Sequence, residues 1–424
     1  MSEIVQYPRG SCALGGAAAA VTHIKRAIPI YHSGPGCQMQ TMAGQRGPSA
    51  SNYYYIGDAP PSTNLYEREI VFGGLDRLDE TIAGTLEIYD GDLFFVLSGC
   101  SADIIGDDTA SVVEKYRRQG VEIVYVDTGG FKGDTFYGYQ AVLDAIAEKI
   151  ALPTDIREPR TVNIFGLVPT QEIFWAGNFE EITRILNKLG VKANTFFSDS
   201  GGLAELQQSS RAALNVNFSP WLCRNTEEIY KERFGIETLH FDGLPVGPTS
   251  TTAFVRKLAD ALQLDNDDVE RVIREEEDYV WDYLEALGES RRYRLAIVGD
   301  TNTVIGLSRF FVEDYGQILL DAVIVDDIPE SADRDRIREI LTSFEYGKPP
   351  KVHFEADYFK IKELLKDEPV EMLLGSSFEH ELSDELNTVF FNVSFPARGK
   401  RILNRGYAGY RGSLTLLEDF FYPY

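Results

Sequence analysis

The sequence predicts an α/β protein made of three Rossmann-like domains, each with a mainly parallel sheet flanked by helices. Three observations support this fold class. The apolar runs are short and continuous, helical segments alternate with them, and two polar breaks divide the chain. Of the 424 residues, 44% are hydrophobic and 12% aromatic, enough for several buried cores.

The predicted strands are apolar throughout rather than alternating with polar residues. Strands that are buried on both faces of a parallel sheet have this composition. Helical segments with glycine at their ends follow several of them, as expected for right-handed β-α-β connections. The predicted strands are "DLFFVLSG" (92–99), "VEIVYVD" (121–127), "TVNIFGL" (161–167), "ANTFFSD" (193–199), "RLAIVGD" (294–300), "DAVIVDD" (321–327), "VEMLLGSS" (370–377) and "TVFFNVSF" (388–395).

Two segments mark the expected boundaries. The stretch 151–160, "ALPTDIREPR", is rich in proline and charge, and a long acidic helix is predicted over 266–292. We therefore expect domains at 1–155, 156–290 and 291–424.

Composition excludes several classes of protein. The net charge of −25 and the lack of a basic stripe argue against nucleic acid as a partner. No apolar run approaches the roughly 20 residues of a membrane span, and the first residues lack the features of a signal peptide. The sequence therefore predicts a cytoplasmic protein that does not bind a membrane.

Three of the four cysteines lie where a strand or loop enters a helix. Cys12 follows Ser11, a candidate N-cap, and opens a helix predicted over 13–27. Cys37 follows the strand "IPIYH" and a Gly-Pro-Gly turn, and Cys100 follows the strand 92–99. In parallel sheets this is the edge where ligands bind.

A helix start favours an anion because its N–H groups are unpaired and it carries about half a positive charge. It lowers the pKa of a cysteine and suits an iron–sulfur cluster, whose sulfur atoms accept hydrogen bonds. Four nearby glycines would let the backbone approach such a cluster: Gly10, Gly34, Gly36 and Gly99.

The cysteine pattern alone leaves the metal open. Zinc remains possible, although only His23 and His32 are close in sequence. Three distant cysteines indicate a large cluster or one shared with another chain, because a cubane normally takes four. The fourth cysteine, Cys223, falls in the predicted second domain.

Two other motifs have structural explanations. "GDTNTVIG" (299–306) follows a strand and opens a helix, but it is neither G-x-G-x-x-G nor a Walker A loop, so we interpret it as a turn. Asp107 and Asp108 are expected to cap a helix after Cys100 rather than to act in acid–base catalysis.

Several segments together resemble component 1 of nitrogenase. They are "SGPGC", "LSGCSADIIGDD", "GLPVGPTSTTAF", "LAIVGDTNTVIGLSRFF" and "NRGYAGYRGSLTLLEDFF". Cys12 and Cys37 are 25 positions apart and Cys100 follows 63 later, close to the cluster cysteines of that family. The C-terminal stretch has no His, so the chain is most similar to the β-type, or K-type, subunit.

The resemblance implies that Cys12, Cys37 and Cys100 provide half the ligands of a P-type [8Fe-7S] cluster, shared with an α-type (D-type) partner in an α2β2 heterotetramer. An ATP-dependent iron–sulfur reductase homodimer would dock transiently, and electrons would pass through the cluster to a metallocofactor in the partner. The active site is expected in the partner chain, so this chain would carry no catalytic residue and bind no nucleotide. The segment near its C-terminus would contact the partner, and Cys223 would be a structural thiol.

Two departures from the family bear on the reaction. Cys12 lies 11 positions after the first residue, whereas nitrogenase β subunits have a long N-terminal extension. Gly129 and Gly130 stand where those subunits have Pro-Ser, a serine that can ligate the oxidised cluster. The chain is therefore most similar to the K-type subunit of methylthio-alkane reductase, which cleaves C–S bonds reductively. The alternatives are a dinitrogen-reducing nitrogenase β subunit and a non-catalytic scaffold for cluster assembly.

Overall fold

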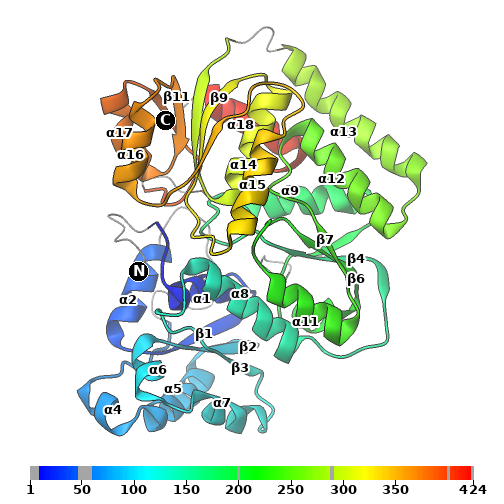
Figure 1. Cartoon of the computed structure of the whole chain (residues 1–424). Coiled ribbons are helices and arrows are strands. Elements are labelled where there is room, and N and C mark those ends of the chain that lie inside the picture. Colours follow the sequence, from blue (N-terminus) through cyan, green and yellow to red (C-terminus); the bar gives the residue numbers. More distant parts are fainter. Residues whose placement is uncertain (1–8, 46–59, 198–200, 287–290, 399–401, 422–424) are drawn as a thin grey trace.

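The computed structural model describes residues 9–45, 60–197, 201–286, 291–398 and 402–421. Three parallel sheets organise it (Figure 1), which confirms the predicted fold class. The first has the order β1 (Ala27–His32), β2 (Leu93–Ser98), β3 (Ile123–Val126). The second has the order β5 (Lys192–Asn194), β4 (Glu158–Phe165), β6 (Ala212–Asn217), β7 (Thr238–His240). The third has the order β10 (Lys351–Phe354), β9 (Ile318–Ile324), β8 (Arg294–Gly299), β11 (Met372–Gly375), β12 (Val389–Asn392).

Helices cover these sheets and connect their strands. In the first predicted domain they are α1 (Ala13–Thr22), α2 (Pro35–Gln45), α4 (Glu67–Phe72), α5 (Leu75–Ile88), α6 (Cys100–Ile105), α7 (Thr109–Arg117), α8 (Thr135–Ala145) and the short turn η1 (Ile146–Ile150). In the second they are α9 (Trp175–Lys188), α10 (Leu203–Gln208), η2 (Ser209–Arg211), α11 (Arg224–Phe234), α12 (Gly247–Leu262) and α13 (Asn266–Ala286). In the third they are α14 (Thr301–Arg309), η3 (Phe310–Asp314), α15 (Ser331–Thr342), α16 (Tyr358–Lys366), α17 (Ser377–Leu386) and α18 (Gly409–Phe421).

Each sheet lies within one of the three predicted ranges, although the division into domains stays a prediction. All nine predicted strands, "IPIYH" included, have a counterpart in the structure. The strand predicted over 193–199 is the least accurate, because β5 ends at Asn194 and residues 198–199 lie outside the described residues. The sequence missed β6, β7 and β10, which are short or carry polar residues inside the sheet. In β6, Asn215 pairs with Asn163 of β4, which in turn pairs with Asn194 of β5. Amide hydrogen bonds of 2.9 Å link the three buried side chains, so polar residues here fix strand register instead of marking a loop.

Helices α1 and α8 pack with their backbones in close contact. A Cβ atom on Gly16 would collide with the backbone of Thr135, and one on Gly138 with the backbone of Ala13. Helices this close need glycine at the crossing point because any larger side chain separates them. The contact holds the start of α1, and therefore Cys12, against the start of α8.

Both ends of the described chain contact segments that are distant from them in sequence. Near the N-terminus, Arg9 is buried and forms a bidentate ion pair with Glu379 of α17. At the other end, α18 packs on α9 and α12 of the second sheet. The ring centroids of Tyr407, just before α18, and Phe174 lie 4.0 Å apart. The third sheet is thus tied to both of the others.

None of the helices within the described ranges is both long and apolar enough to cross a membrane.

Candidate functional site

Cys12 is itself the N-cap residue of α1, which corrects the prediction that Ser11 caps the helix. The Ser11 side chain instead lies 3.1 Å from the Thr135 hydroxyl at the start of α8. The helix also ends at Thr22, earlier than predicted, because the chain turns into β1 at Ala27. Cys12 is exposed, and a backbone bridge to Asp134 anchors it.

Cys37 lies in the first turn of α2, shortly after β1, as predicted. The predicted Gly-Pro-Gly turn is instead part of the helix start, because α2 begins at Pro35. It is half-buried. Burial raises the pKa of its thiol, and the neighbouring thiols of Cys12 and Cys100 raise it further. The expected lowering of the pKa by the helix start is therefore wrong for Cys37 in the protein alone. A metal that binds this thiol would have to displace its proton.

Cys100 is the first residue of α6 and follows β2 through Gly99. Its sulfur accepts a hydrogen bond of 3.1 Å from the backbone N–H of Gly130, in the loop after β3. A Cβ atom on Gly130 would lie 3.1 Å from the sulfur of Cys100 and 3.3 Å from that of Cys12. Gly130 therefore lies between two of the three thiols, and its missing side chain leaves the space beside them open.

The three cysteines thus come together at the carboxyl edge of the first sheet, from three different helix starts. Within the described part of the chain, no three His, Cys, Asp or Glu side chains surround a point closely enough to hold one metal ion.

The four glycines near the cysteines differ in their surroundings, and their role beside a cluster stays a prediction. A Cβ on Gly99 would meet the Ser33 side chain at 2.5 Å, and one on Gly10 would meet the Thr135 hydroxyl at 3.0 Å. Gly34 has only the Leu65 carbonyl near it, at 3.6 Å, and Gly36 faces open space. Gly130, in contrast, borders sulfur, and its relation to the cysteines came from the family resemblance.

Residues around the site are mostly structural. His32 is fully buried beneath Gly74, and its Nε2 lies 2.9 Å from Asp107, which also accepts from the Gly74 N–H. Burial lowers the pKa of His32. Asp108 caps α7, as expected, through the Ser111 N–H.

Cys223 lies apart from the other three cysteines, fully buried in the main core at the start of α11. It has a left-handed backbone conformation, with φ of 71°. Burial raises the pKa of its thiol well above the usual value. These features agree with a structural thiol.

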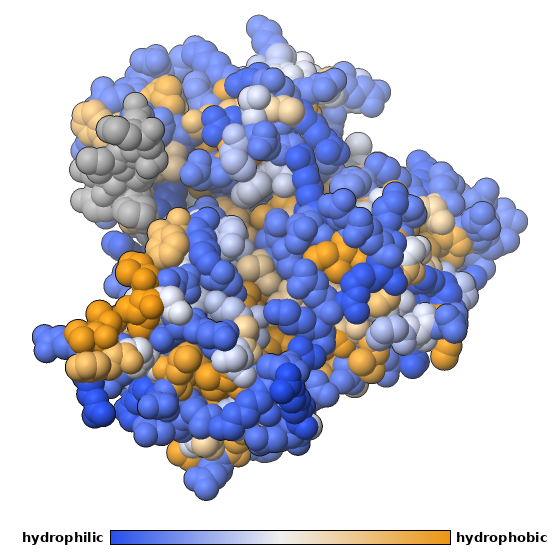
Figure 2. Space-filling model, turned by 60° about the horizontal axis from the view of Figure 1, so that its bottom comes forward, coloured by the Kyte–Doolittle hydropathy of each residue, from blue (hydrophilic) through white to orange (hydrophobic). Residues whose placement is uncertain are grey.

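Apolar side chains are exposed beside the cysteine site. On α4, which packs on α6, Val71 is 71% exposed and Phe72 is 84% exposed. Ile104 of α6 is 75% exposed, and Phe131, next to Gly130, is 62% exposed. Figure 2 shows apolar residues gathered at the lower left, where the first sheet and its helices lie. We call Val71, Phe72, Ile104 and Phe131 the apolar patch.

Fold and site together define a class: an α/β protein of three parallel sheets in which three cysteines come together at the carboxyl edge of the first sheet. Comparison with known proteins agrees. The family model described as "Nitrogenase component 1 type Oxidoreductase" matches residues 12–422, so the chain belongs to that family.

The curated relatives include nitrogenase molybdenum-iron protein beta chains. The chain is 26% identical to that of Sinorhizobium fredii, over 98% of this chain and 82% of the relative. It is 25% identical to that of Methanothermobacter thermautotrophicus, over 98% and 93%. The solved structure titled "Nitrogenase Cp1 at pH 6.5" superposes with a TM-score of 0.82 at 18% identity, covering 100% of this chain and 93% of that one. That likeness shows the fold.

Proposed function

We propose that this chain is the electron-transfer, β-type subunit of a nitrogenase-like reductase complex, with Cys12, Cys37 and Cys100 holding half of a P-type [8Fe-7S] cluster. The observation that carries the proposal is the meeting of the Cys12 and Cys100 thiols at Gly130. The Cys37 thiol lies close enough to both that, beyond the effect of burial, their charges raise its pKa. Family membership adds the class of chemistry, oxidoreduction.

The residues present fit a sulfur-rich cluster. Gly130 offers an N–H to the Cys100 sulfur and no side chain that would fill the adjoining space. Hydrogen bonds to cluster sulfur raise its reduction potential, and solvent exposure shifts it as well. When bound, the cluster would supply one-electron transfer between a reductase and the cofactor of the partner. This chain's own contribution is to hold the thiolates in place and to exclude water on the Cys37 side.

A shared cluster requires a partner at the cysteine edge. The exposed Cys12 and the adjoining apolar patch fit such a role, because isolated soluble chains seldom expose several large apolar side chains together. We propose that an α-type subunit covers this edge in an α2β2 heterotetramer and that an ATP-dependent reductase homodimer docks transiently near the cluster. The active site would then lie in the partner.

For the reaction, we propose reductive C–S cleavage of methylthio-alkanes. The support is Gly130, where a nitrogenase β subunit has a serine that ligates the oxidised cluster. Dinitrogen reduction is the second candidate, because the relatives described above are beta chains of nitrogenase. Turnover assays of the purified complex with reductase and ATP, on dinitrogen and on a methylthio-alkane, separate the two. A complex that turns over neither would instead be a scaffold for cluster assembly.

The cluster assignment is tested by replacing each cysteine with alanine in the co-expressed complex, purified anaerobically. We expect Cys12→Ala, Cys37→Ala and Cys100→Ala each to lower the iron content and to change the electron paramagnetic resonance spectrum of the cluster. Cys223→Ala is the matched control and should keep the iron. Full iron content in all three variants, or a wild-type complex without iron, would contradict the proposal.

A further inference from the structure

The loop after β3 brings the Gly130 N–H to the sulfur of Cys100, and both ends of this loop are anchored. It runs over residues 127–133, between β3 and the cap of α8, and we call it the glycine loop. At its start, the Thr128 N–H donates to the Ser98 hydroxyl at 3.1 Å, and the Thr128 hydroxyl donates to the Ser98 carbonyl at 2.8 Å. Ser98 is the last residue of β2, so this end of the loop is fixed to the first sheet.

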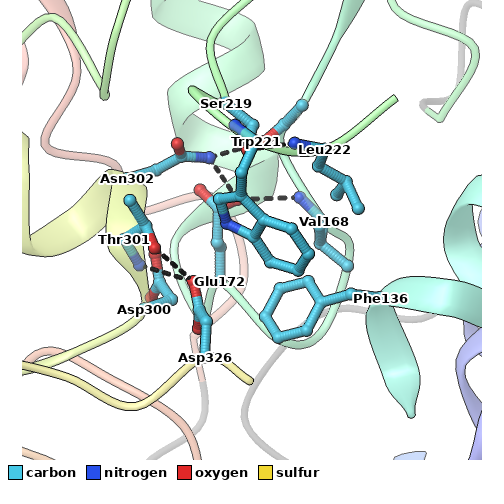
Figure 3. A pocket seen from close by; sticks show the side chains of 11 residues that line it. Phe136, Val168, Glu172, Ser219, Trp221, Leu222, Asp300, Thr301, Asn302 and Asp326 are labelled. Atoms are coloured by element: carbon cyan, nitrogen blue, oxygen red, sulfur yellow. Dashed lines mark hydrogen bonds between the residues drawn. The ribbon is translucent and has the colours of Figure 1, made fainter. Parts of the chain in front are cut away.

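The other end of the glycine loop is fixed by α8. Asp134 caps this helix and accepts hydrogen bonds from the N–H groups of Phe136 and Tyr137, at 3.0 and 3.2 Å. The Phe136 ring packs edge-on against Trp221, with centroids 5.2 Å apart, in the wall of a small cavity between the second and third sheets (Figure 3). The core thus supports both ends of the loop, and its middle depends on other contacts.

The middle of the loop contains two consecutive glycines, Gly129 and Gly130. A pair of glycines can adopt more backbone conformations than any other pair, so the sequence of the loop does not by itself hold the Gly130 N–H on sulfur. The Lys132 N–H donates to the Gly129 carbonyl at 2.9 Å, which closes a tight turn. The hydrogen bond of 3.1 Å from Gly130 to the Cys100 sulfur is formed from inside this turn. Its persistence depends on what holds Lys132.

The side chain of Lys132 joins the turn to two carboxylates. Its ammonium group lies 3.3 Å from Asp103 Oδ2 and also pairs with Asp127 Oδ2. Asp103 belongs to α6, three residues after Cys100, whereas Asp127 is the first residue of the glycine loop. Lys132 therefore ties the loop to itself and to the helix that begins with Cys100.

The ion pair with Asp103 is largely shielded from water. The side chains of Lys132 and Asp103 are 27% and 11% exposed. A Cβ atom on Gly129 would lie 2.1 Å from Asp103 Oδ2, so the loop lies directly on this carboxylate. Without the ammonium group, Asp103 would keep a nearly buried charge beside the loop, which is unfavourable unless the loop moves or water enters. Loss of the Lys132 charge should therefore release the turn.

We propose that Lys132 is a positioning residue. By pairing with Asp103 and Asp127, it keeps the Gly130 N–H on the Cys100 sulfur, and through this contact it raises the reduction potential of the cluster that the three cysteines hold. A hydrogen bond to cluster sulfur has this effect because it stabilises the reduced form, which is more negative. The effect on the potential rests on the proposed function, whereas the effect on the loop does not.

Hydrogen exchange of the full chain in its purified complex tests the effect on the loop. Mass spectrometry with fragmentation follows the amides of Thr128 and Gly130 separately. In Lys132→Met, the Gly130 amide should exchange about fivefold faster, as expected for the loss of a partly buried ion pair. The Thr128 amide, which is bound to the end of β2, should exchange as in the wild type. Asp127→Leu should act in the same direction on Gly130, although it changes the charge in the opposite direction.

The second measurement is the reduction potential of the cluster, followed through its electron paramagnetic resonance signal in the iron-loaded complex. At the midpoint potential of the wild type, Lys132→Met should raise the ratio of oxidised to reduced cluster about fivefold, and Lys132→Arg, which keeps the charge, should restore the ratio. Lys115→Met is the matched control. Lys115 pairs with Asp79 between α7 and α5, outside the glycine loop, so this variant should change neither measurement.

Exchange at Gly130 that is unchanged in Lys132→Met would overturn the inference. An unchanged potential in an iron-loaded Lys132→Met complex, or an equal effect of Lys115→Met, would overturn it as well. A wild-type complex without iron is a separate result. It would overturn the proposed function together with the effect on the potential, while the exchange rates would still decide whether Lys132 holds the loop.

Discussion

Asp314 shows how one side chain makes stability depend on pH. Its Oδ1 accepts from the Thr249 hydroxyl, whereas its Oδ2 is buried without a partner in the described structure. Burial raises the pKa of this carboxyl group to about 7. The folded protein therefore binds a proton at Asp314 between about pH 4 and pH 7, where the unfolded chain has released it.

We therefore expect Asp314 to make the free energy of unfolding fall as the pH rises from about 4 to 7. Asp314→Asn keeps the acceptor for Thr249 but cannot ionise, so it should remove up to about 1.4 kcal/mol of that fall per pH unit. Denaturant unfolding at several pH values measures the difference between wild type and variant. Parallel stability curves for the two proteins would show that Asp314 titrates normally.

At the scale of elements, the contact of α1 with α8 depends on glycine. Gly138→Ala should push the helices apart and cost about 1–3 kcal/mol, as overpacking does in other cores. Gly84→Ala on α5 is the control, because no atom lies within 4 Å of its added Cβ. That control should be neutral or gain up to about 1 kcal/mol from helix propensity. Thermal unfolding of both variants measures the contrast, and an unchanged Gly138→Ala would show that the helices can shift freely.

The elements also show what the sequence could predict. Apolar runs such as 92–99 and 294–300 were recognisable because strands buried on both faces need no polar residue. Strands β6 and β10 are not predictable from the sequence, because Asn215 and Lys351 break the apolar pattern. The pairing of both strands also depends on residues that are distant in the sequence. The end of α1 was misplaced for the same reason, since its alanines favour helix beyond Thr22 but pairing with β2 draws residue 27 into the sheet.

The candidate site was predictable only in part. The position of each cysteine at a helix start followed from local patterns. The meeting of Cys12 and Cys100 at Gly130, with Cys37 nearby, depends on the connections of the first sheet. No short motif contains this arrangement, because the residues come from segments that are distant in the sequence.

For the whole molecule, the apolar patch gives a prediction about assembly. Ile104→Asp and Phe131→Asp place a charge beside the cysteine edge, where a partner would exclude water. Each should weaken association with the α-type partner at least tenfold, as expected for central interface residues that contribute about 2 kcal/mol or more. Phe359→Asp on α16 is the control, since Phe359 is 57% exposed but belongs to the third sheet.

Co-purification of tagged chain and partner, followed by binding titrations, measures this effect. The lone chain of each variant should keep its unfolding temperature, because these side chains bury little surface. Unchanged binding in both variants would place the partner on another face.

The ion pair between Arg9 and Glu379 has a consequence for biosynthesis. A ribosome makes Arg9 before its partner Glu379, which follows 370 positions later in the sequence. Until then Arg9 has a charge that cannot be buried alone, since an unpaired buried charge costs several kcal/mol. The segment that carries Cys12 therefore becomes fully ordered only after most of the third sheet has been made, so its folding depends on residues that come far later in the sequence.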